Sequence, residues 1–61
     1  MKEFQTILAL EEEAARLYRQ LAEDCDDALA SEMLLRIARD ETAHVAIAQE
    51  LVKLAKRWVS P

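Results

Sequence analysis

Glycine is absent from this chain, and its single proline is the last residue, Pro61. Turns that depend on glycine are therefore excluded, and no proline interrupts a helix before the C-terminus. Phe, Tyr and Trp occur once each, so an aromatic core is excluded as well. Ala, Leu, Glu and Arg dominate what remains, and all four are good helix formers. We predict an all-α protein.

Cysteine is equally scarce. The single thiol, Cys25, excludes an internal disulfide and a cysteine-based zinc site. The longest apolar runs are far shorter than the roughly 20 residues of a membrane span, and the first residues do not resemble a signal peptide. The net charge of −4 gives no electrostatic case for binding nucleic acid or an anionic membrane. We expect a cytoplasmic protein whose Cys25 stays reduced.

The chain length of 61 residues permits one structural unit with a small core. Such a unit buries too little surface to be comfortably stable alone, and a disulfide is already excluded. The chain therefore needs a metal, a partner or both.

Two segments with helical apolar periodicity flank a polar stretch. We predict helices over about residues 3–24 and 28–58, joined by a turn at about 25–27. Asp27 is the natural N-cap of the second helix, and the final Ser-Pro should end it. Because the connection is so short, the helices should form an antiparallel hairpin.

A heptad register starting with Phe4 at position a places apolar residues at almost every a and d position. Three residues on this seam are exceptions: Glu11, Glu41 and His44. Outside the seam, the spacing of Glu12 with Arg16 and of Glu32 with Arg36 predicts surface ion pairs. The full set of a and d residues is Phe4, Ile7, Glu11, Ala14, Tyr18, Leu21, Cys25, Ala30, Leu34, Ile37, Glu41, His44, Ala48, Leu51, Ala55 and Trp58.

Positions on both sides of the seam are also apolar, which makes the stripe wider than one neighbouring helix can cover. The simplest closed solution is a two-fold homodimer of hairpins, a four-helix bundle. The flanking apolar residues are Leu8, Leu10, Ala15, Leu17, Ala22, Met33, Ala38, Val45, Ile47, Val52 and Leu54.

The three polar seam residues have the spacing of metal ligands. Glu41 and His44 form an E-x-x-H pair on one helix face, although a hydrogen-bonded core histidine is an equally good interpretation of His44 alone. Glu11 points inward, whereas Glu12 and Glu13 point outward. Buried carboxylates need compensation, and no Lys or Arg lies on the seam to provide it. Because all three lie at similar distances from the turn, they should meet at one height and bind a cation.

These residues resemble the motifs of the ferritin-like and rubrerythrin-like di-iron carboxylate proteins. Glu11, Ala14 and Tyr18 resemble the E-x-x-A-x-x-x-Y pattern, and Glu41 with His44 resembles the E-x-x-H pattern. The family takes its ligands from four helices, and this chain supplies half of them. The resemblance therefore implies a homodimer with one shared two-metal site, similar to encapsulated ferritins and to designed minimal di-iron hairpins.

The resemblance also implies roles for two further residues. The Tyr18 hydroxyl would hydrogen-bond a ligand carboxylate, and Asp40 would orient a ligand histidine through its other ring nitrogen. The alternatives are a core aromatic for Tyr18 and, for Asp40, a solvated carboxylate or one paired with Arg36.

The function implied by the resemblance is oxygen or peroxide chemistry on two iron ions per dimer, with manganese as the other metal that suits this donor set. Glu11, Glu41, His44 and Tyr18 would form the active site of a ferroxidase-like enzyme. The alternatives are rubrerythrin-like peroxide reduction, with reductant from outside, and a non-enzymatic dimerisation module with a structural metal. The sequence leaves open whether the chain is natural, designed or truncated, and whether it assembles further or lies inside a protein nanocompartment.

Overall fold

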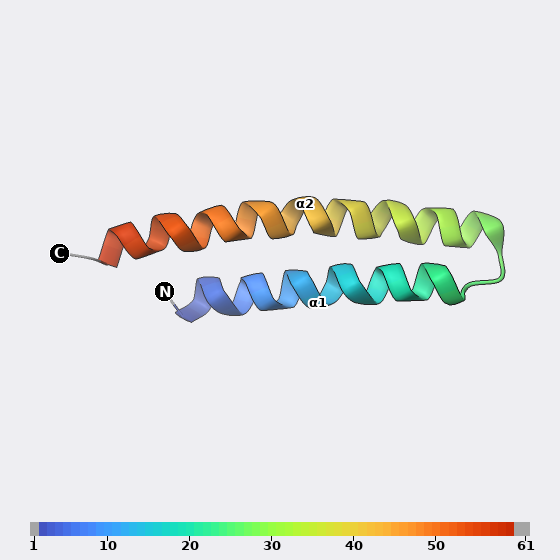
Figure 1. The fold of residues 1–61 in the computed structure, drawn as a ribbon, viewed down its shortest axis with the longest axis horizontal. Helices are drawn as coiled ribbons and strands as arrows, with labels where there is room; N and C mark the ends of the chain where they lie inside the picture. The colour runs from blue at the N-terminus through green and yellow to red at the C-terminus, as the bar shows by residue number, and fades with distance from the viewer. Residues whose placement is uncertain (1, 60–61) are drawn as a thin grey trace.

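The computed structural model describes residues 2–59 and forms a hairpin of two antiparallel helices, α1 (Lys2–Asp24) and α2 (Ala28–Val59), which lie side by side (Figure 1). No strand is present over these residues. The predicted all-α hairpin is confirmed. Relative to the prediction, α1 begins one residue earlier and α2 ends one residue later. The predicted Ser-Pro stop lies outside the described residues.

The turn at 25–27 is held by hydrogen bonds from the start of α2. The backbone N–H of Ala30 donates to Asp27 Oδ1 at 2.9 Å, and that of Ser31 donates to the Asp27 carbonyl at 2.9 Å. Asp27 is therefore the N-cap, as predicted. The Ser31 hydroxyl donates to the Ala22 carbonyl at 2.7 Å, which ties the end of α1 to the first turn of α2.

The contact between the two helices is lined by alanine. The buried residues are all alanines, with at most 9% of their surface exposed. Small side chains let two helices approach closely, but they bury little apolar area. Within the described chain, the buried residues are Ala15, Ala22, Ala38, Ala48 and Ala55.

The inner seam of the hairpin differs from the predicted one. Every a and e position of α1 and α2 between residues 4 and 55 is buried or half-buried, whereas every g position and most d positions of the two helices are exposed. Within the single hairpin, the predicted a positions are covered, whereas most of the predicted d positions are not. The physical reason is that a two-helix hairpin buries only one flank of each helix, and the alanines at e favour the a/e flank.

The large apolar side chains gather on the opposite flank, which we call the outer face: the d and g positions of both helices. Nine of the ten large hydrophobic residues that are exposed lie there, and Leu29 is the exception. In other proteins, exposed apolar surfaces are typical of association sites. The nine residues are Ile7, Leu10, Leu17, Leu21, Met33, Ile37, Ile47, Leu54 and Trp58.

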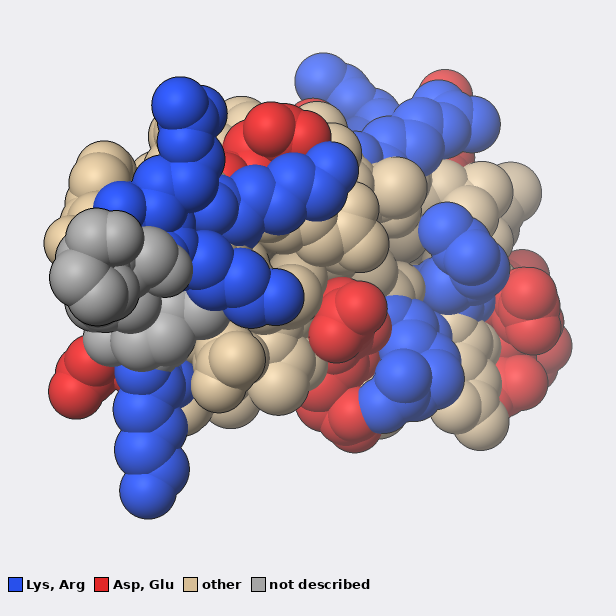
Figure 2. Space-filling view, turned by 60° about the vertical axis from the view of Figure 1, so that its left-hand side comes forward, with Lys and Arg blue, Asp and Glu red and all other residues tan. Residues whose placement is uncertain are grey.

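Charged side chains cover much of the remaining surface, and lysine and arginine gather at the open end of the hairpin (Figure 2). The predicted pair of Glu12 with Arg16 is wrong, because Arg16 contacts Glu13 instead. Glu32 and Arg36 form no ion pair within residues 2–59. Exposed pairs of this kind contribute little to stability. Over the same residues, neither helix has a segment that is long and apolar enough to span a membrane.

Candidate metal centre

The three polar seam residues meet in the middle of the hairpin. The Nδ1 atom of His44 lies 3.0 Å from Oε2 of Glu11 and 3.7 Å from Oε1 of Glu41. One ligand atom from each residue lies within 4.8 Å of the other two. The prediction that Glu11 in α1 meets Glu41 and His44 in α2 at one height is therefore confirmed. The cause is the short turn, which fixes the relative height of the helices.

The cluster opens onto the outer face. The side chain of His44 is 54% exposed, whereas those of Glu11 and Glu41 are 27% and 19% exposed. The two carboxylates occupy a positions at the border of the helix contact, and the imidazole occupies an outer d position. The alternative of a core histidine is wrong for the single chain, because a core residue would not expose half of its side chain.

The contact between His44 and Glu11 shows how the cluster would hold a cation. At 3.0 Å, His44 Nδ1 and Glu11 Oε2 are close enough to be ligands of one ion. The imidazole would bind that ion in its neutral form. No Lys or Arg forms an ion pair with Glu11 or Glu41 among residues 2–59, so the two negative charges remain available to a cation.

The donor set fits iron or manganese, but it is incomplete. Two carboxylates and one imidazole supply three ligand groups, whereas octahedral sites take about six donor atoms. The open side of the cluster faces away from the hairpin. An octahedral ion bound here would need further donors from outside this hairpin, either water or a second copy.

Tyr18 and Asp40 do not contact the cluster within one chain. Tyr18 lies one heptad beyond Glu11, which is about 10 Å along the helix, and it makes no hydrogen bond with the described residues. Asp40 is exposed on the outer face and pairs with neither His44 nor Arg36 over residues 2–59. The alternative of an Arg36-paired Asp40 is wrong for the single chain. The roles implied by the resemblance stay predictions.

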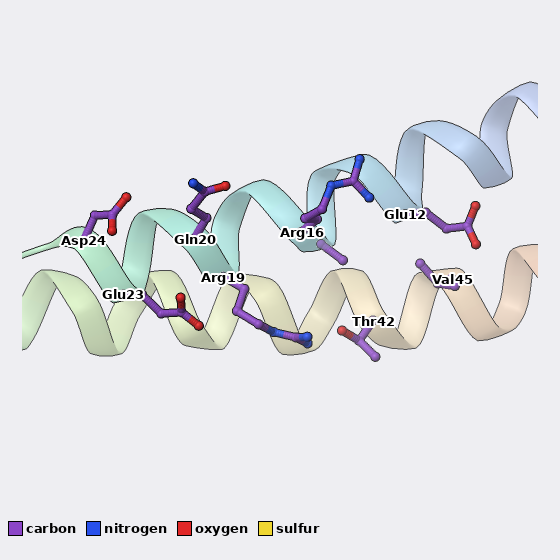
Figure 3. Close-up of a pocket in the computed structure, with 9 residues that line it drawn as sticks. Glu12, Arg16, Arg19, Gln20, Glu23, Asp24, Thr42 and Val45 are labelled. Atoms are coloured by element: carbon purple, nitrogen blue, oxygen red, sulfur yellow. The ribbon is translucent and has the colours of Figure 1, made fainter.

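A groove on the flank opposite the outer face contains none of the three cluster residues (Figure 3). It runs between the helices, and charges of both signs line it, with Arg19 reaching across toward α2 near Thr42. The sequence did not predict this groove. Its acidic side chains are spread along α1, and no histidine is among the described residues that line it.

The sequence also did not predict which side of the hairpin carries the cluster. The signal was present: alanine recurs at the e positions and large side chains recur at the g positions. Because a helix pair packs closest where side chains are small, this asymmetry would have placed the cluster at the edge of the hairpin contact.

Comparison of the chain with protein-family models, with curated proteins and with solved structures finds no match. The resemblance to the ferritin-like proteins therefore rests on the sequence motifs alone.

Proposed function

We propose that two hairpins pair through their outer faces and share one two-metal site, and that this site binds and oxidises iron(II). The observation that carries the proposal is the position of Glu11, Glu41 and His44. Their ligand atoms lie within 4.8 Å of one another, in the middle of the only large apolar surface described on residues 2–59. Covering that surface with a second copy places a second set of ligands opposite the first.

The doubled set supports iron as the substrate. Two copies supply four carboxylates and two imidazoles, which is the donor set of the ferritin-like two-metal proteins. Iron(II) bound there would give up electrons to dioxygen or peroxide, and manganese would bind the same donors. In each chain, Glu11 and Glu41 balance the charge of the cations and His44 binds as neutral imidazole. The surrounding apolar side chains exclude bulk water.

Titration with iron(II) in air tests the proposal. We expect saturable oxidation, followed by near-ultraviolet absorbance, with an end point at about two irons per dimer. Glu41→Gln keeps the size of the side chain but removes its charge, so stoichiometric binding should be lost. Glu12→Gln removes the same charge from an exposed neighbour of Glu11 and should leave the end point unchanged. Unchanged binding in Glu41→Gln, or full binding by a monomer, would refute the shared site.

The exposed outer face also favours a second function, a dimerisation module whose metal is structural. Over the described residues the hairpin buries alanines and leaves large apolar side chains exposed, so pairing is a structural need regardless of any reaction. The redox-inert ion Zn²⁺ separates the two functions. If Zn²⁺ stabilises the dimer as strongly as Fe²⁺ and iron oxidation stays at the buffer rate, the module is structural. Faster consumption of peroxide than of dioxygen would instead indicate rubrerythrin-like peroxide reduction.

A further inference from the structure

Two hairpins that pair through their outer faces can be related by a two-fold axis in two ways. An axis across the helices puts the turns at opposite ends of the bundle, with α2 facing the partner's α2. An axis along the helices puts both turns at the same end, with α2 facing the partner's α1. Both ways keep facing helices antiparallel and bring the two ligand sets to one height. The proposed metal site therefore does not choose between them.

The unequal helix lengths favour turns at opposite ends. Helix α2 has 32 residues and α1 has 23, so α2 is nine residues longer, or about 13 Å. The excess lies at the open end, where α2 extends past the start of α1 (Figure 1). There Leu54 is 39% exposed and Trp58 is 65% exposed. The chain's own α1 reaches Trp58 only through Phe4, with the ring centroids 5.9 Å apart, and a partner's α1 would reach no further. A partner's antiparallel α2 extends along the whole open end.

The position of His44 allows the partner's α2 to cover the whole length of α2. His44 lies at the middle of α2, because the two ends of the helix, Ala28 and Val59, are almost equally far from it along the chain. A two-fold axis at its height therefore overlaps the whole of both α2 helices. Trp58 follows His44 by two heptads, so it lies level with the partner's Ala30, which precedes His44 by two heptads. The axis matches d positions of one α2 with d positions of the other, whereas each g position lies level with an a position. At the d positions apolar residues meet apolar ones: Trp58 with Ala30, and Leu51 with Ile37.

The charge distribution favours turns at opposite ends, independently of helix length. Between residues 20 and 33, around the turn, the chain has five acidic residues and no Lys or Arg. The open end carries Lys2, Lys53, Lys56 and Arg57 against two acids, Glu3 and Glu50, and the cations dominate that end in Figure 2. Turns at the same end would set the acidic turns against each other at about 20 Å, which is within one Debye length at low salt, about 30 Å at 0.01 M. Turns at opposite ends set each basic end beside an acidic turn.

From length, register and charge we infer that the second copy docks with its turn at the open end of the first, with α2 on α2 and the two-fold axis level with His44. This inference rests on the proposed function for the existence of the dimer. The relative orientation of the two hairpins is argued independently of that function. The partner is a second copy of this chain because the axis through His44 matches the apolar d positions of α2 with one another.

The native thiol allows a direct test, since Cys25 is the only cysteine and lies in the turn. A nitroxide label on Cys25 and pulsed dipolar spectroscopy of the full-length dimer measure the distance between the two turns. Turns at opposite ends place the labels about 50 Å apart, because half of α2 separates each turn from the axis. Turns at the same end place them about 20 Å apart, roughly two helix diameters.

A label at Arg39 in the variant Cys25→Ser, Arg39→Cys is the control. Arg39 is exposed and close to the height of His44, so its two labels lie within a short distance in both arrangements. The long Cys25 distance with the short Arg39 distance is the expected result. A short Cys25 distance overturns the orientation and leaves the shared site standing. Absence of dipolar coupling at both positions, with a monomeric mass, overturns the shared site together with the orientation.

Reversing the charge at the open end gives a second measurement without a label. Lys56→Glu with Arg57→Glu should weaken dimerisation about 10-fold at low salt, and the difference should shrink at high salt because the charges are screened. In the same-end arrangement, the two open ends face each other, and the reversal changes the net charge of each from +2 to −2. The repulsion between the two open ends therefore stays the same. Unchanged affinity at low salt therefore overturns the inferred orientation.

Discussion

The two apolar flanks of this hairpin are built from different side chains. The flank between the helices buries five alanines, whereas the outer face exposes nine large hydrophobic residues. A monomeric protein would place its large side chains inside, where their burial contributes most to stability. The contrast teaches that the contact within the chain only sets the distance and height of the two helices. In the proposed dimer, the main apolar burial is left to the contact between chains, and the ligand cluster lies at that second contact.

Placing a charge on the outer face should have the largest effect, because it would prevent the two hairpins from pairing. Ile47 is 60% exposed in the single hairpin and neighbours His44 on the outer face. Ile47→Glu would bury a carboxylate with no partner in the dimer, at a cost of about 3 kcal/mol or more per chain. We expect a monomer with reduced helix content in sedimentation and circular dichroism.

Gln49→Glu adds the same charge to α2 at an exposed position outside the outer face and should leave the dimer intact. If Ile47→Glu remained as dimeric as Gln49→Glu, the outer face would not be the contact between chains.

The second largest effect should come from metal binding, which should stabilise the pairing of two hairpins through their outer faces. At 100 times its dissociation constant, a cation that binds only the folded dimer adds about 2.7 kcal/mol. We expect Mn²⁺ to raise the denaturation midpoint of the native chain, and chelation to reverse the change. The same addition should leave Glu41→Gln unaffected, since a ligand charge is missing. An equal rise in both proteins would mean that the metal binds elsewhere.

Enlarging a buried alanine should destabilise the contact between α1 and α2, with a smaller effect. Ala38 is 2% exposed between the helices, and Ala38→Leu would push them apart at a cost of about 2 kcal/mol. The measurement is urea denaturation of the dimer. Ala46→Leu makes the same change on the exposed side of α2 and should alter the free energy of unfolding by less than about 0.5 kcal/mol. Equal effects would show that the helices are not closely packed.

The hydrogen bond between the helices near the turn should contribute least. Ser31→Ala removes the hydroxyl that donates to Ala22, for a loss of about 1 kcal/mol in the free energy of unfolding. Thr6→Ala removes a hydroxyl that bonds to Lys2 within α1 only, and it should have almost no effect. A larger loss in Thr6→Ala would show that local helix stability limits folding, rather than the contact between the helices.

Much of the fold could be predicted because it depends on local physics. The absence of glycine and internal proline, the apolar periodicity and the cap at Asp27 act over a few residues, and the observed helices follow them closely. The surface pairs were less predictable, because Arg16 can reach either Glu12 or Glu13 at similar cost. The choice between them depends on side-chain rotamers, which spacing alone does not determine.

The sequence by itself determined two helices, their antiparallel direction and the common height of Glu11, Glu41 and His44. A short turn and a constant rise per residue are enough for that. Only the tertiary structure decided which flank of each helix faces the other. That choice depends on packing across the hairpin, where alanines allow the closest approach, and it turned His44 and the large apolar residues outward. The cluster therefore lies at the edge of the hairpin contact and opens onto the outer face.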